Sequence, residues 1–157
     1  MPPPLPARTA PSRVILALTL ALALAGCEGS GGPVPTPADF SDLSAALSRH
    51  GITLEGVVSG EAGCADQELA RTAKRVRASG LDQQAPATVY IYMFRDRTTF
   101  ERLRPAVDAC ARSYVADPST YATVAVSPFV AAGQGPWGAR FTAALQAGLS
   151  EAAGTGG

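Results

Sequence analysis

Four segments of the chain place apolar residues at the spacing of one helix face. In the clearest segment, Phe100, Leu103 and Val107 follow one another at intervals of three and four residues. Cys110 continues this stripe, which puts it on the inner face of the predicted helix. Proline inside a helix costs about 3 kcal/mol or a kink, so a bend is expected at Pro105. The predicted helices cover 37–50, 66–79, 98–115 and a last stretch from 136 to 152.

Three other segments have the pattern of β-strands. Residues 89–94 are apolar or aromatic at every position, which is typical of a central strand covered on both faces. The other predicted strands are 52–58 and 121–126. Pro128 ends the latter strand or marks it as an edge, and 129–132 could resume it after a bulge.

The order of these elements predicts the fold class. Successive strands are separated by about 27–30 residues, enough for a right-handed crossover that contains one helix. We therefore predict a small single α/β domain with a three-stranded, mainly parallel sheet and four helices. The alternative is a ferredoxin-like α+β sandwich in which a strand has been missed. The domain is expected to cover 37–152 and to be monomeric, with a frayed glycine-rich tail over 153–157.

Residues 1–26 have the three parts of a secretory signal. Arg8 and Arg13 give a positive start, and the apolar run 14–25 follows without a charge. A transmembrane helix needs roughly 20 apolar residues, so this run is too short to remain as one. The alternative is a buried core helix.

The run ends in Leu24-Ala25-Gly26-Cys27, which resembles the lipobox of bacterial lipoproteins. The resemblance implies that the Cys27 thiol receives a diacylglyceryl group, and that cleavage before Cys27 makes it the mature N-terminus. Two or three acyl chains hold a protein on a membrane durably, whereas one chain holds it only marginally. If Cys27 is a chance cysteine instead, this anchor does not exist.

The resemblance also implies a location in the cell envelope. Residues 27–36 are rich in glycine and proline and are expected to form a flexible tether between lipid and domain. Glu28 stands where lipoproteins retained at the inner membrane often have aspartate. We therefore expect the outer membrane in a Gram-negative host, and otherwise the outer face of the plasma membrane.

Charge argues against one class of partner. Without Arg8 and Arg13, the remaining chain has 11 basic and 13 acidic residues, a net charge of about −2. Nucleic-acid-binding domains carry a basic excess, so no nucleic acid is expected as a partner. His50 is the only histidine, and we therefore expect no metal site, no cofactor and no histidine-dependent nucleophile.

The cysteines suggest a covalent link within the domain. With Cys27 taken by lipid, Cys64 and Cys110 remain as an even pair in an exported chain. We predict a disulfide between them. Two buried free thiols are the alternative, and a redox-active pair is a weaker one because neither cysteine lies in a C-x-x-C motif.

A parallel sheet would bring three loops to one edge, where open α/β sheets bind ligands. These loops are 59–64, 95–98 and 133–137. Arg95 or Arg97 could then hold an anion, and Trp137 could offer a stacking face. The plainer interpretation is a solvated charged loop and a core tryptophan.

The sequence predicts only a general class of function. Residues 87–151 resemble small uncharacterised bacterial lipoprotein domains, which supply no catalytic residues to transfer. We predict a non-enzymatic envelope module that binds a small molecule or an envelope protein. The alternative is an envelope hydrolase that uses Asp96 or Glu101.

Overall fold

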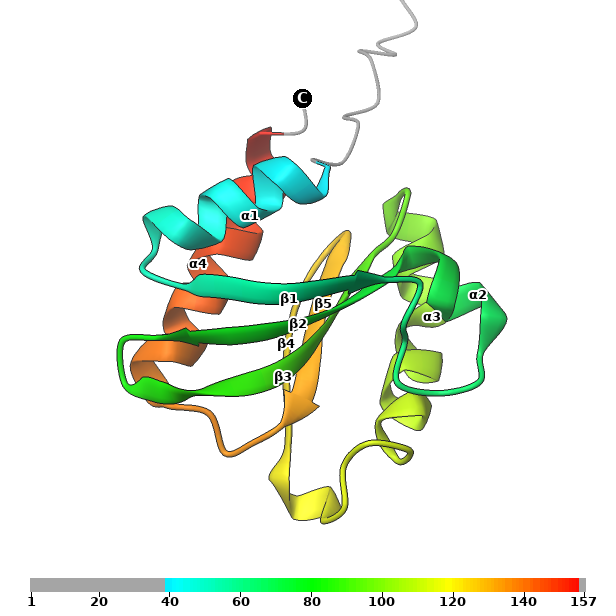
Figure 1. Cartoon of the computed structure of the whole chain (residues 1–157). Helices are drawn as coiled ribbons and strands as arrows, with labels where there is room; N and C mark the ends of the chain where they lie inside the picture. Colours follow the sequence, from blue (N-terminus) through cyan, green and yellow to red (C-terminus); the bar gives the residue numbers. More distant parts are fainter. Residues whose placement is uncertain (1–38, 156–157) are drawn as a thin grey trace, which may run out of the picture. The chain divides into compact units, whose positions relative to one another are not determined.

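The computed structural model describes residues 39–155, which form one five-stranded antiparallel sheet with helices against both faces (Figure 1). The strands lie in the order β1-β2-β3-β5-β4. In chain order the elements are α1 (Phe40–Arg49), β1 (Thr53–Ser59), α2 (Gln67–Thr72), β2 (Ala73–Gly80), β3 (Gln83–Met93), α3 (Arg97–Ala111), the 3-10 helix η1 (Pro118–Thr120), β4 (Tyr121–Val126), β5 (Phe129–Gln134) and α4 (Ala139–Thr155).

The predicted three-stranded, mainly parallel sheet is wrong. Strand β2 was predicted as helix, and β5 only as a resumption of the strand at 121–126. Each pairs with a chain neighbour in a hairpin, and all four strand pairings are antiparallel. The connections counted as long crossovers therefore contain strands, and hairpins need only short turns. The alternative prediction, an α+β sandwich with missed strands, fits.

Strand β2 was missed because its sequence fits a helix stripe as well. Asp66 caps α2 as predicted, accepting hydrogen bonds from the backbone of Glu68 and Leu69. The helix then ends at Thr72 instead of continuing to residue 79. Val76 and Ala78 are buried and alternate with arginines, the period of two that a strand requires. Pairing with strands on both sides decides the conformation here.

The other strands agree better with the pattern. Strands β1 and β4 occupy nearly the predicted positions, and β3 begins earlier, at Gln83. Pro86 is tolerated in β3 because the pairing with β5 starts only at Val89. Residues 129–134 form a separate strand after the Ser127–Pro128 turn and do not resume β4 through a bulge.

The helices also differ from prediction in detail. Helix α3 runs without a break through Pro105, which is exposed, so that water can reach the Glu101 carbonyl left without its donor. Helix α4 starts at Ala139, not at 136, and continues to Thr155, so residues 153–155 are helical where a frayed tail was expected. Helix α1 is capped by Asp39, and the predicted start at residue 37 lies outside the described residues.

Each face of the sheet has its own hydrophobic core, as predicted for a central strand covered on both sides. Val89 and Ile91 of β3 pack with α1 and α4 on one face. Tyr90 and Tyr92 pack with α2 and α3 on the other. All four side chains are buried, so β3 anchors both layers.

The N-terminal predictions lie outside the described residues. These are the signal 1–26, the lipid attachment at Cys27 and the tether 27–36. Within residues 39–155, every helix is too short or too polar to cross a bilayer.

Candidate functional site

A small hollow opens at one edge of the sheet, where β1 and β3 both end. These strands run in the same direction because β2 lies antiparallel between them. The hollow has a volume of about 240 Å³ and lies between the end of β1, the α2–β2 junction and the residues after β3. Its polar lining consists of Ser59, Gly60, Arg71, Thr72, Lys74 and Arg95. We call this hollow the basic pocket.

Three cations line the basic pocket. Arg71 forms no ion pair or side-chain hydrogen bond within residues 39–155. The Lys74 ammonium donates a hydrogen bond to the Ser59 hydroxyl at 2.8 Å. The Arg95 guanidinium pairs with Asp96 at 3.0 Å and is 87% exposed. The lining itself carries three cations and no carboxylate and is therefore electropositive, while Asp96 pairs with Arg95 and Glu68 attracts Arg71 from outside it.

The hydroxyl and amide groups around these cations differ in what they can still donate. The Thr72 hydroxyl donates to the Leu69 carbonyl at 3.0 Å, and the Gly60 amide donates to the Ala73 carbonyl at 2.9 Å. The Ser59 hydroxyl accepts from Lys74, so within the described chain its own proton is left for another acceptor. The pocket thus offers an incoming anion two guanidiniums, one ammonium and one hydroxyl.

The three residues predicted to share a ligand do not lie together. Arg95 lines the basic pocket, whereas Arg97 begins α3 and pairs with Glu101 at 2.8 Å. Trp137 lies at the other end of β3, beside Gly133 and Thr88, because β5 runs antiparallel to β3. The prediction of one shared site for Arg95, Arg97 and Trp137 required a parallel sheet. It is wrong because the sheet is antiparallel.

Trp137 has a packing role. Its ring lies edge-on to that of Phe141, with centroids 6.0 Å apart, and its indole N–H donates to the Gln134 carbonyl at 3.1 Å. The side chain rests against the core under α1 and α4. This agrees with the plainer interpretation of the tryptophan.

The sequence prediction missed Arg71 and Lys74. Both fall within the predicted helix over 66–79, where charged side chains are commonplace on the solvent face. The alternation of Val76 and Ala78 with arginines after Lys74 is the feature that could have placed a strand there. A strand starting at Ala73 turns the chain sharply and brings the two cations beside the end of β1.

The two candidate catalytic carboxylates have structural partners. Asp96 is the N-cap of α3 and accepts a hydrogen bond from the Thr99 backbone N–H at 2.7 Å. That backbone bond, with further hydrogen bonds from the Thr99 and Arg95 side chains, lowers the pKa of Asp96 to about 2. Glu101 is exposed and paired with Arg97. Asp96 is therefore ionised at neutral pH and has no proton to give to a leaving group.

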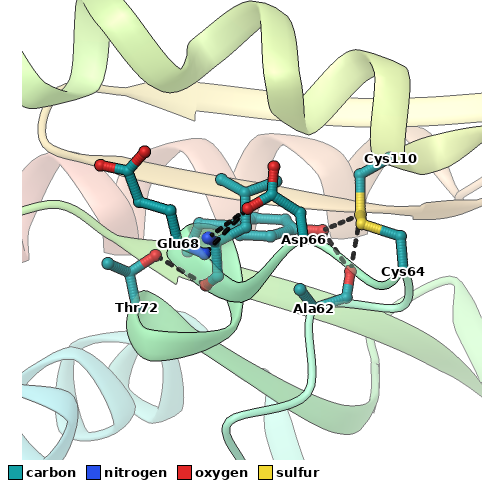
Figure 2. The surroundings of a disulfide bond; sticks show 8 residues. Ala62, Cys64, Asp66, Glu68, Thr72 and Cys110 are labelled. Atoms are coloured by element: carbon teal, nitrogen blue, oxygen red, sulfur yellow. Dashed lines mark hydrogen bonds between the residues drawn. A yellow bond between two sulfur atoms is a disulfide. The ribbon is translucent and has the colours of Figure 1, made fainter.

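Cys64 and Cys110 form a disulfide that joins the loop before α2 to the inner face of α3 (Figure 2). Their Cα atoms are 5.5 Å apart. The buried Tyr92 hydroxyl donates to the Ala62 carbonyl at 2.7 Å, and the Cys110 sulfur lies 3.1 Å from the same oxygen. Burial raises the pKa of Tyr92, so its hydroxyl remains a donor. The disulfide and this hydrogen bond fix the loop that leads into α2.

A second hollow lies on the face of the sheet that α2 and α3 cover. Its volume is about 390 Å³, and Thr88, Tyr90, Tyr114 and Gln134 line it. The Tyr90 and Tyr114 rings are 4.3 Å apart between centroids and stand against Gly63, which the adjacent disulfide holds in place. Its lining side chains are neutral, unlike those of the basic pocket.

No group of three or more histidine, cysteine or acidic side chains within residues 39–155 is arranged to hold a metal ion. His50 instead contacts Glu151 of α4 at 2.9 Å. No family model, no curated protein and no solved structure matches this chain. The basic pocket and the N-terminal sequence are therefore the two features that indicate a function.

Proposed function

We propose that this protein is a lipid-anchored protein of the cell envelope whose domain binds a phosphate-bearing anion in the basic pocket without transforming it. The observation that carries the proposal is the convergence of Arg71, Lys74 and Arg95 on one hollow. Arg71 and Lys74 come from the α2–β2 junction and Arg95 from the residues after β3, and the fold brings these two segments together.

The envelope location has two supports. The first is the lipobox-like sequence that ends in Cys27, behind a basic and apolar leader. The second is the disulfide between Cys64 and Cys110, because such bonds persist chiefly in oxidising compartments outside the cytosol. Lipid on Cys27 would hold the domain at the outer membrane of a Gram-negative host, or at the outer face of the plasma membrane.

The composition of the pocket favours phosphate as the ligand group. A guanidinium presents a planar fork of N–H donors that matches phosphate oxygens, and an ammonium acts as a point charge. The Ser59 hydroxyl adds one neutral donor. At about 240 Å³ the pocket is smaller than the roughly 300–1,000 Å³ of sites for drug-sized ligands, which suits a small charged group.

Binding is favoured over hydrolysis by the state of the carboxylates. A hydrolase of the alternative kind needs a carboxylic acid that keeps its proton near neutral pH. Asp96 has its pKa lowered to about 2 and is used as a helix cap. Asp96 therefore cannot supply the proton that the hydrolase alternative requires, and the Glu101 carboxylate is held in an exposed ion pair with Arg97.

Titration with inorganic phosphate tests this function. The full chain is kept in a non-ionic detergent, and the backbone amides of Gly60 and Thr72 are followed by two-dimensional NMR. We expect saturable shifts confined to the pocket. Removing one charge-assisted hydrogen bond, by Arg71→Gln or by Lys74→Gln, should weaken binding about tenfold.

The matched control is Arg77→Gln, which removes an exposed arginine from the same strand as Lys74 but outside the pocket. It should leave the phosphate affinity within about twofold of the original. Shifts that are spread over the whole domain, or an Arg71→Gln/Lys74→Gln double variant that binds as tightly as the original, would refute the proposal.

A further inference from the structure

We infer that the phosphate in the basic pocket belongs to an anionic phospholipid headgroup, and that the pocket and the neighbouring edge of β1 form a surface that lies on the bilayer. This inference rests on the proposed function, because it names the ligand of the same pocket. Three observations point to it.

The first observation is an apolar patch directly beside the cations. Val57 and Val58 are the two large hydrophobic side chains that are exposed within residues 39–155, at 46% and 38%. They immediately precede Ser59 and Gly60 of the basic pocket. Exposed apolar residues bordered by cations are the composition of surfaces that lie in a membrane interface.

The second observation is that this patch is a free edge of the sheet. β1 is the outermost strand, and it is bulged between Glu55 and Val58, with Gly56 at φ +60°. Its outer N–H and C=O groups need water or polar partners, which the hydrocarbon core of a bilayer does not supply. The edge therefore suits the hydrated headgroup layer, where valine side chains can insert while the backbone stays solvated.

The third observation concerns the position of the pocket relative to the anchor. The Lys74 ammonium lies 5.1 Å from the centre of the Phe40 ring, at the first residue of α1. Phe40 is the thirteenth residue after Cys27, and thirteen steps of chain span at most about 43–47 Å. The pocket thus lies beside the start of α1, where the segment from the proposed lipid on Cys27 joins the domain.

These features act together at a negatively charged leaflet. Arg71, Lys74 and Arg95 are drawn to the surface within about a Debye length, roughly 8 Å at physiological salt. One headgroup phosphate then enters the pocket, while Val57 and Val58 contact the interface. Free phosphate would bind the same three cations as a headgroup phosphate, but it would not explain why Val57 and Val58 are exposed beside them.

The test uses the protein purified from the membrane fraction of a bacterial host, held in small bicelles through the lipid that we propose on Cys27. One preparation contains phosphatidylcholine alone and a second contains added phosphatidylglycerol. A trace of lipid with a nitroxide on its headgroup broadens NMR signals of nearby amides. We expect strong broadening over 57–60 and 71–74 with phosphatidylglycerol, and at least about threefold less with phosphatidylcholine alone or after raising the salt.

Variants separate the contributions. Val57→Ser combined with Val58→Ser should lower the broadening, as should Lys74→Gln, whereas Arg77→Gln should leave it unchanged. Equal broadening in both lipids, broadening centred on another face, or self-association through β1 would overturn the inference. If inorganic phosphate still saturates the pocket in that case, the proposed function stands and only its lipid ligand is excluded. If phosphate fails to bind in detergent, the proposed function itself fails.

Discussion

The carboxylate of Asp82 caps helix α4 by accepting a hydrogen bond from the backbone N–H of Phe141 at 2.8 Å, across 59 residues of chain. Its second oxygen accepts from the Arg140 N–H at 2.9 Å. Asp82 lies in the turn between β2 and β3, so this turn also starts the last helix. Gly138 lies against the carboxylate, where a side chain would collide with it. One residue therefore joins the central hairpin to the helix that covers it.

Replacing Asp82 by alanine should lower the stability of the fold. The variant leaves two N–H groups at the start of α4 without their acceptor, and N-cap loss is destabilising in most helices. Urea denaturation followed by circular dichroism gives the midpoint. Glu55→Gln is the control, because Glu55 is an exposed carboxylate in an edge strand. Equal midpoints for both variants would show that the cap contributes nothing.

The two capping aspartates should make the protein acid-sensitive. The backbone N–H of Arg140 is the main cause of the lowered pKa of Asp82. The backbone N–H of Thr99 is the main cause of the lowered pKa of Asp96, which is about 2. An unfolded aspartate has a pKa of about 3.9, so below that pH the unfolded chain binds more protons than the folded one. The stabilising effect of both carboxylates is therefore complete above about pH 4 and is lost as the pH falls toward 2.

Urea midpoints measured between about pH 6 and pH 2 test this dependence. The wild-type midpoint should fall over the acid half of the range. An Asp82→Ala/Asp96→Ala double variant should start lower and fall less steeply, since the two groups no longer titrate. Parallel curves for the two proteins would count against the assignment.

Gly63→Ala should destabilise the domain by about 3 kcal/mol. Gly63 has φ +79°, and a methyl group there would lie 2.8 Å from Cζ of Tyr90 and would also collide with Tyr114. Gly154→Ala is the matched control, because nothing lies within 4 Å of a methyl group at that position of α4. It should be neutral or stabilising by up to about 1 kcal/mol. Chemical denaturation of both variants measures the contrast, and a Gly63→Ala protein as stable as Gly154→Ala would be inconsistent with this packing.

Removing the disulfide by Cys64→Ala and Cys110→Ala should cost roughly 3–4 kcal/mol. The bond closes a loop with a sequence separation of 46, and the loop-entropy relation gives that magnitude. Reduction of the original protein should lower its urea midpoint in the same way, and should leave the double variant unaffected. A reductant that changes neither protein would indicate that the bond does not form.

Strong periodic patterns allowed individual elements of the fold to be predicted, though not the sheet itself. Val89–Met93 was recognised as central because every position is apolar or aromatic, and the stripe through Phe100, Leu103 and Val107 located α3. The pair Cys64 and Cys110 followed from counting cysteines and from the inner position of Cys110. Each of these features depends on local sequence or composition alone.

The sheet order and the pocket could not be predicted in the same way. Residues 73–80 satisfy both a helix stripe and a strand alternation, and only pairing with β1 and β3 selects the strand. That one element decides whether Arg71 and Lys74 lie on an outer helix face or beside Ser59. The position of Trp137 likewise depends on the direction of β5, which no local pattern encodes.

An intact mass and a non-reducing peptide map of the protein from the membrane fraction of a bacterial host decide whether the domain is anchored in the envelope. We expect a chain that begins at an acylated Cys27 and yields one peptide pair joined through Cys64 and Cys110. Such a product would place the basic pocket in the envelope, within reach of anionic headgroups. A chain that retains residues 1–26, with no lipid on Cys27 and with two free thiols, would refute the lipid-anchored envelope protein that we propose.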